Sequence, residues 1–288
     1  MENKITGLVN MPNADYHAGP GISKSHLDAI SGGTPLHYWS KYLDPNRERP
    51  EPTPAMVLGS AVHSAILEPD VFPTEYTTVP ENAPNRPTAA QRNAKNPSTG
   101  TLLAIDYWDE FEAANKGKVI LSPGDYSFCL QMRDAVNRHP LASRILGSGK
   151  AEQSFFAIDD ETGELVKCRT DWLADNGLIA DVKTTESASP ANFGKSVANF
   201  RYYVQAAFYS DILQQLYGEA PPAFVFLAVE KTPPFAVAVY FATPEQIELG
   251  REYYRKDLNL IAECKRTGNW PGYPDEALPI ELPRWFTR

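Results

Sequence analysis

The chain has 288 residues, of which 42% are hydrophobic and 22% charged, so it is not a disordered chain, a collagen or a coiled coil. With 36 acidic and 27 basic residues its formal charge is −9, which excludes a uniformly basic surface and requires any phosphate site to be local. The three widely spaced cysteines fit neither a disulfide framework nor a cysteine-ligated metal site. With no leader-like N-terminus and no long apolar run, we expect a cytoplasmic protein that does not enter the membrane.

The first half of the chain, residues 1–150, is predicted to be mainly helix and loop. Ten prolines fall between Pro45 and Pro97, which breaks this region into short pieces. One of these pieces has apolar residues at helical spacing and carries His63, and Ser122 has the features of a helix N-cap. The predicted elements are a buried helix over 55–67, a functional loop over 79–101, and helices over 101–116 and 122–139.

The second half, residues 151–288, changes to alternating apolar segments separated by turn residues, which is typical of strands. Asp160 to Gly163 and Asp175-Asn176-Gly177 are predicted turns of a three-stranded antiparallel meander. No internal repeat is present, so we expect one α/β domain over residues 1–288 with a helical N-terminal portion. The predicted elements are strands over 151–159, 165–174, 178–183, 223–230 and 235–241, and helices over 190–199, 202–217 and 244–267.

The second turn of the meander brings charged residues together. If Asp175-Asn176-Gly177 is a three-residue loop, Asp171 lies opposite Asp181, and strand alternation adds Lys183 to the same face. Val182 then points the other way, into the core. A two-residue turn would instead place Asp171 on the opposite face. The first register therefore predicts two carboxylates and one ammonium around a single point.

Two like charges facing each other across a hairpin are destabilising, so this arrangement calls for a cation. A hard divalent ion such as Mg²⁺, held by both carboxylates and a carbonyl, would offset the repulsion and polarise a phosphate. Lys183 would orient an attacking water or stabilise negative charge in the transition state. On its own, however, an Asp-x-Lys triplet occurs by chance in a chain of this length, and such charged hairpins are commonly solvated.

Longer segments, taken in order from about Tyr16 to Trp285, resemble the C-terminal nuclease domain of the RecE family, exodeoxyribonuclease VIII, in the RecB-like branch of the PD-(D/E)xK superfamily. The resemblance implies a mixed central sheet flanked by helices. The segments are GSAVH (59–63), ILEPDVF (66–72), AEQSFF (151–156), CRTDWL (168–173), DVKTT (181–185), YYVQAAFYSD (202–211), FVFLAVE (224–230) and LPRW (282–285).

The resemblance assigns a role to each residue of the charged hairpin. It implies that His63, Asp171 and Asp181 are metal ligands together with the carbonyl of Val182, and that Lys183 is the catalytic lysine. The proline of the superfamily's Pro-Asp pair is replaced by threonine here, which is tolerable because the proline carries no chemistry. Taken alone, in an apolar helix, His63 fits a buried core histidine better than a metal ligand.

Three further residues take supporting roles under the same resemblance. Gln205 and Tyr209, four residues apart on one helix, match a Gln-x-x-x-Tyr signature that supports the lysine or touches DNA near the scissile phosphate. Glu152 stands where related nucleases keep an acid, which implies an auxiliary role. Simple helix packing is the alternative for Gln205 and Tyr209.

Basic residues near these segments are candidates for phosphate binding, since arginine forks match phosphate geometry, although solvated surface charge is the commoner role. The segment ISKSHL adds Ser23 and Ser25 at a helix N-terminus that could hold an anion. The candidate DNA-binding residues are Arg86, Arg92, Lys95, Lys195 and Arg201.

The activity implied is a Mg²⁺-dependent exonuclease, with Mn²⁺ as a substitute, that degrades linear duplex DNA from its 5′ ends and leaves 3′ single strands. The implied partners are double-stranded DNA ends and a RecT-like single-strand annealing protein, and the implied assembly is a ring, most simply a tetramer. The alternatives are another RecB-like nuclease, specific for single strands or cutting internally, and a catalytically inactive DNA-binding or assembly module.

Overall fold

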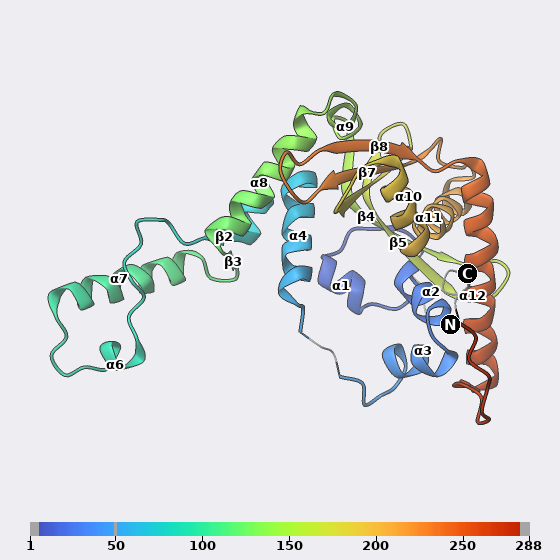
Figure 1. Cartoon of the computed structure of the whole chain (residues 1–288), viewed down its shortest axis with the longest axis horizontal. Coiled ribbons are helices and arrows are strands. Elements are labelled where there is room, and N and C mark those ends of the chain that lie inside the picture. Colours follow the sequence, from blue (N-terminus) through green and yellow to red (C-terminus); the bar gives the residue numbers. More distant parts are fainter. Residues whose placement is uncertain (1–5, 49–50, 283–288) are drawn as a thin grey trace.

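A six-stranded mixed sheet forms the centre of the computed structural model, which describes residues 6–48 and 51–282 (Figure 1). The strand order is β1-β4-β5-β6-β7-β8, and only the β6–β7 pair is parallel. The mixed sheet implied by the sequence is thus confirmed. The strands are β1 (Gly7–Val9), β4 (Gly149–Ile158), β5 (Leu165–Ala174), β6 (Ile179–Thr185), β7 (Phe224–Glu230) and β8 (Val237–Phe241).

The predicted meander is present as β4, β5 and β6, joined in antiparallel order. Gly177 has a φ of 83°, in the left-handed region where a glycine is favoured, and the amide of Ala174 donates to the carbonyl of Leu178. The three-residue turn and its register are therefore confirmed. The long β4–β5 hairpin and this turn together fix where Asp171 and Asp181 lie.

Strand β7 shows why the sheet is covered on both faces. Its apolar residues alternate: Phe224, Phe226 and Ala228 join one buried cluster, and Val225, Leu227 and Val229 join another. Helices α2, α3, α10, α11 and α12 contribute to the first cluster, and α4, α8 and α9 to the second. The helices flanking the sheet are α2 (Lys24–Ser31), α3 (Pro35–Tyr42), α4 (Pro54–Leu67), α8 (Pro123–Arg138), α9 (Pro140–Ile145), α10 (Pro190–Asn199), α11 (Tyr202–Tyr217) and α12 (Pro244–Thr267).

Between α4 and α8 the chain leaves the body as an arm, drawn at the left of Figure 1. Two short parallel strands form its base, and a long helix runs back along it. The expected loop over 79–101 is mostly irregular, but it contains one turn of helix and its last residues begin the long helix. The elements of the arm are α5 (Phe72–Glu75), β2 (Tyr76–Thr78), α6 (Ala89–Arg92), α7 (Thr99–Ala114) and β3 (Val119–Leu121).

The N-terminal half contains strands that the sequence did not indicate, which corrects its description as helix and loop alone. Three residues of β1 pair with Ser154 to Phe156 and form one edge of the main sheet, and α1 (Asn13–Ala18) follows directly. β1 is too short to show an alternating pattern, so only its long-range pairing reveals it.

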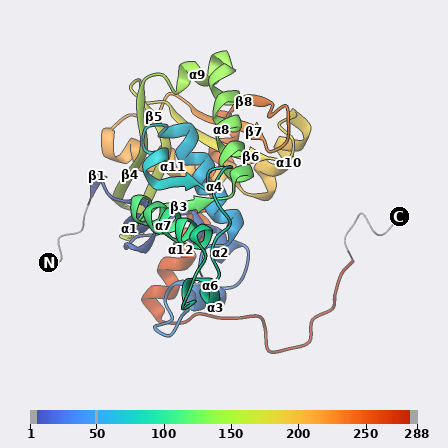
Figure 2. The ribbon, with the colours of Figure 1, turned by 90° about the vertical axis from the view of Figure 1, so that its left-hand side faces the viewer.

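After α12 the described chain continues to residue 282 with neither helix nor strand, and Figure 2 shows this segment leaving the body. Residues 283–285 of the LPRW segment lie outside the described residues. Within the described part of the chain, no helix is long and apolar enough to cross a membrane.

Candidate metal centre

One histidine and two carboxylates from three different elements converge in the structure. His63 lies on α4, Glu152 on β4 and Asp171 on β5, and one ligand atom from each lies within 4.8 Å of the other two. His63 Nδ1 lies 3.3 Å from Asp171 Oδ2. An imidazole with two carboxylates is a donor set that suits divalent ions such as Mn²⁺ and, through its oxygens, Mg²⁺.

The sequence of α4 explains the position of His63. Thr53 caps the helix by accepting a bond from the amide of Met56, and α4 then packs against the sheet and α8. Ala61, Val62 and Ala65 are buried on that packed side, whereas the side chain of His63 keeps 30% of its surface exposed. His63 is therefore not a fully buried core histidine, and it faces the two carboxylates.

Glu152 reaches the cluster through an unusual backbone conformation. Its φ is +53°, and the ladder pairs Ala151 with Trp172 and Gln153 with Thr170 but skips Glu152 and Asp171 between them. A left-handed residue other than glycine costs about 1–3 kcal/mol and persists only where its surroundings hold it in place. Arg169 Nε holds the Glu152 carboxylate at 2.5 Å. Glu152 was expected to be auxiliary, but it lies among the ligand atoms themselves.

Asp171 is fixed by the neighbouring strand. The β5–β6 ladder ends at the Trp172–Ala180 pair, and continuing its register brings Asp171 opposite Asp181, as predicted. Beyond that pair the amide of Val182 donates to Asp171 Oδ2 at 2.8 Å in place of a ladder bond. The side chain of Val182 is buried in the core on the α4 and α8 side, also as predicted.

Asp181 lies next to this cluster but is not one of its three members, so its role as a metal ligand stays a prediction. Gln205 Nε2 donates to Asp181 Oδ2 at 2.7 Å, and Lys183 Nζ donates to Gln205 Oε1 at 3.0 Å. Lys183 also forms an ion pair with Asp181 Oδ1, but that oxygen accepts no hydrogen bond with acceptable geometry. Asp181 is 1% exposed, so this buried oxygen still has the capacity to bind a cation.

The charges of the centre shift the pKa values of its members. Burial, and then the charges of Asp181 and Glu152, raise the pKa of Asp171 well above its usual range. Burial lowers the pKa of His63, so its imidazole is neutral and can act as a ligand. Burial also opposes the charge of Lys183, but Asp181 and Asp171 more than offset this and raise its pKa. A cation bound next to Asp171 would therefore stabilise the ionised form of its carboxylate.

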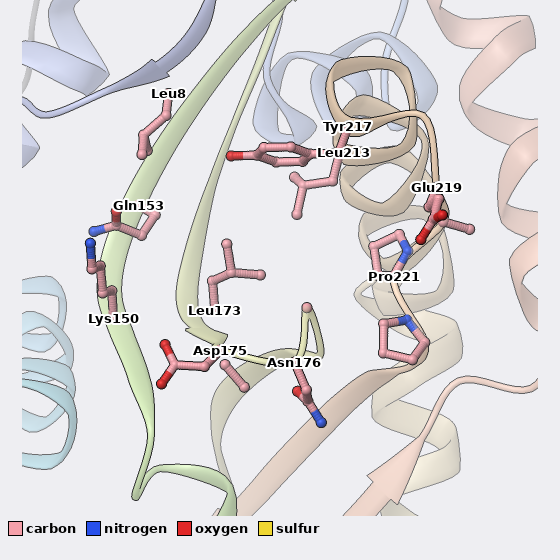
Figure 3. A pocket seen from close by; sticks show the side chains of 14 residues that line it. Leu8, Lys150, Gln153, Leu173, Asp175, Asn176, Leu213, Tyr217, Glu219 and Pro221 are labelled. Carbon is pink, nitrogen blue, oxygen red and sulfur yellow. The ribbon is translucent and has the colours of Figure 1, made fainter.

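The cluster opens into a cavity of about 890 Å³, which we call the acidic cavity; its walls include His63, Glu152, Asp171 and Tyr209. Tyr209 is largely buried and comes from the same helix as Gln205, so α11 contributes to the centre at both positions. A cavity of about 390 Å³ shares Gln153 with it but is built differently: Figure 3 shows Leu173, Leu213 and Tyr217 at its centre, with polar groups around the rim. Only the acidic cavity offers a histidine–carboxylate set.

Two residues that the sequence did not single out support the centre. Arg169, two residues before Asp171 on β5, holds Glu152, and this spacing along one strand is the only signal that could have revealed it. The ring of Tyr202 lies 4.5 Å from Lys183 Nζ. The place of Tyr202 at the start of the Gln205 helix is the signal in the sequence for this contact with the lysine.

The candidate DNA-binding residues do not gather around this centre. Arg86 and Arg92 lie on the arm and form ion pairs with Glu112 and Asp109 of α7. Lys95 and Lys195 are exposed, on the arm and on α10 respectively.

Arg201 makes several contacts within the chain, and its role in phosphate binding stays a prediction. Its guanidinium forms ion pairs with Asp28 and Asp257 and donates to the carbonyl of Leu27, which ties the start of α11 to α2 and α12. Ser23 is also engaged locally: it caps α2 and bonds His26 and Ser25.

Comparison with known proteins places the fold. The family described as "PDDEXK-like domain of unknown function (DUF3799)" matches residues 23–281. A crystal structure of a candidate exonuclease from Eubacterium rectale superposes with a TM-score of 0.62 at 14% identity, covering 96% of this chain and 97% of that one. Among curated proteins none matches. These findings agree with the PD-(D/E)xK part of the predicted resemblance and do not single out the RecE family.

Proposed function

Because the chain belongs to this PDDEXK-like family, we propose that it is a divalent-metal-dependent deoxyribonuclease. The observation that carries the proposal is the joint geometry of His63, Glu152 and Asp171 beside the Asp181–Lys183–Gln205 network. Ligands for a hard cation beside an ammonium group suit phosphodiester hydrolysis, because both positive charges stabilise the negative charge that develops on the phosphate.

His63, Glu152 and Asp171 would hold the ion, and the family resemblance adds Asp181 and the carbonyl of Val182. A bound divalent ion supplies Lewis-acid polarisation of the phosphate and an acidified water. The residues of the chain keep the site prepared: Arg169 orients Glu152, and the Val182 amide orients Asp171.

Lys183 provides the second element of the mechanism. Its raised pKa keeps the ammonium charged, so that it stabilises the negative charge that develops on the phosphate in the transition state. Gln205 accepts a bond from Lys183 and donates one to Asp181, which holds the ammonium in place. In this mechanism Gln205 is a positioning residue.

The finer proposal follows the RecE resemblance. We propose an exonuclease that uses Mg²⁺, or Mn²⁺ in its place, and degrades linear duplex DNA from 5′ to 3′ to leave strands for a RecT-like annealing partner. A closed ring, most simply a tetramer, would enclose the duplex and reconcile a chain of charge −9 with a polyanionic substrate.

The test is a digestion assay on blunt linear duplex, nicked circular duplex and single strands, with Mg²⁺ and with chelator. The expected result is digestion of the linear duplex with Mg²⁺, no digestion of the other two substrates, and no digestion with chelator. Cutting of nicked circles would favour an endonuclease, and digestion limited to single strands would favour another RecB-like specificity. No digestion of any substrate with Mg²⁺ or Mn²⁺ would contradict the proposal and favour a DNA-binding module.

A further inference from the structure

A second cavity, of about 670 Å³, adjoins the acidic cavity and has no part in the proposed mechanism. It lies between α1, the Gly19–Ile22 turn, α2 and α3, and we call it the basic cavity. His17 belongs to the walls of both cavities, so they meet at α1. Two neighbouring cavities can receive successive parts of one flexible polymer, and the size of the second suits a ligand of a few hundred Å³.

The charge of the basic cavity is opposite to that of its neighbour. The described residues that line the basic cavity include two cationic side chains, Arg47 and Lys265, and no carboxylate. Arg47 donates to the main-chain carbonyl of Asp44 at 3.3 Å, and Lys265 pairs with Glu164 at 2.5 Å. Burial and then the nearby charges of lysines lower the pKa of His26 in the wall to about 3. An anion is the ligand that this field attracts.

Aromatic rings line the same cavity. The His26 and Tyr42 rings stack with centroids 3.9 Å apart and an angle of 23° between their planes, and Tyr38 packs beside them. Tyr42 is half-buried, and Tyr42 Oη donates to the carbonyl of Ser25 at 3.0 Å, which fixes its ring. Fixed aromatic faces next to cationic groups are the common means of binding single-stranded nucleic acid without sequence preference.

We propose that the basic cavity is a nucleotide subsite for the DNA strand held at the acidic cavity, with Arg47 and Lys265 binding a phosphate and Tyr42 providing a stacking surface. This inference rests on the proposed nuclease function, whose site it extends by one or a few nucleotides. Because His17 lines both cavities, a strand held in one lies next to the other. The two cavities differ in charge, so they bind phosphate in different ways. The acidic cavity needs a cation to accept phosphate, whereas the basic cavity does not.

The test compares Arg47→Gln with Arg266→Gln, a matched loss of one charge on α12, where Arg266 pairs with Glu263 away from both cavities. A labelled single-stranded oligodeoxythymidylate is titrated at several salt concentrations against each variant, built on Lys183→Ala so that the probe stays intact. We expect Arg47→Gln to weaken binding about tenfold and to lower the salt slope by about 0.7, the value for one phosphate contact on a single strand. Arg266→Gln should change neither quantity.

On the otherwise intact chain, Arg47→Gln should raise KM for DNA and leave kcat unchanged. Equal affinity and salt slope for the two variants would overturn the subsite, even if the protein proves to be a nuclease. Should the chain cleave no DNA and Arg47→Gln still lower affinity for the strand, the proposed function would fail and the subsite would stand. Arg47-dependent binding of thymidine monophosphate without any effect on the strand would indicate a product site and also overturn the inference.

Discussion

Replacing Glu152 by glutamine tests the most consequential feature of the centre, because the structure places this residue among the candidate metal ligands. The substitution keeps the size of the side chain and removes one negative charge. The three ligand atoms lie within 4.8 Å of one another, so one ion can contact all three, and Glu152 supplies one of the two carboxylates among them. Losing one charged ligand of three should weaken binding of a divalent ion by about 10- to 100-fold, which corresponds to about 1.4 to 2.7 kcal/mol.

The assay is thermal or chemical unfolding with Mn²⁺ and with chelator. At a free metal concentration of about 100 times the parent Kd, binding stabilises the fold by about 2.7 kcal/mol. The same concentration should stabilise Glu152→Gln by only about 1.4 kcal/mol for a tenfold weaker site, or about 0.4 kcal/mol for a hundredfold weaker one. Asp171→Asn should behave in the same way.

Glu68→Gln is the matched control, since Glu68 lines the same cavity but lies outside the group of three ligand residues. It should keep the full gain from Mn²⁺. If Glu152→Gln kept the gain and Glu68→Gln lost it, the ligand set inferred from the structure would be wrong. Measuring both variants with chelator as well separates a loss of metal binding from a general loss of stability.

Three other predictions follow from the site and its surroundings. Lys183→Ala and Asp181→Asn should each lower kcat on linear duplex by at least about 100-fold while unfolding stays cooperative; turnover near that of the parent would refute their roles. Ca²⁺ should bind without supporting cleavage, which competition with Mn²⁺ can check, because its larger and looser coordination misplaces the water. Burial lowers the pKa of Lys167 from 10.5 to about 8, so between these values the unfolded chain binds more protons at this residue, and the contribution of Lys167 to stability rises with pH by up to about 3 kcal/mol. The difference in unfolding free energy between the parent and Lys167→Met should change with pH by this amount, and a difference that is independent of pH would contradict the prediction.

Much of the fold was predictable because its signals are local. The turn at Gly177 and the apolar run of β7 depend on residues close together in sequence, and the structure confirms the turn and the strand. The register followed from the turn, so Asp171 and Asp181 could be placed opposite each other in advance. β1 and the β2–β3 pair were missed because three-residue strands depend on distant partners and carry almost no pattern of their own.

The centre was predictable in its members but not in its arrangement. His63, Asp171 and Lys183 carry recognisable residue types at recognisable positions, whereas the left-handed backbone of Glu152 has no counterpart in the sequence. Strand periodicity assumes extended conformation at every residue, and one positive φ redirects a single side chain without changing the register on either side. The ion pairs of Arg201 could not be predicted for a related reason, since its carboxylate partners are far away in the sequence and packing brings them together.

The two adjoining cavities suggest why an acidic chain can hold a polyanion. Without a divalent ion, the carboxylates of the acidic cavity offer phosphate no attraction, so a strand is attracted to the basic cavity at Arg47 and Lys265. A bound cation is the largest local charge and reverses the sign of the acidic cavity, so both cavities then attract the same strand. Because coupling between two ligands is reciprocal, DNA must strengthen metal binding by the factor by which metal strengthens DNA binding.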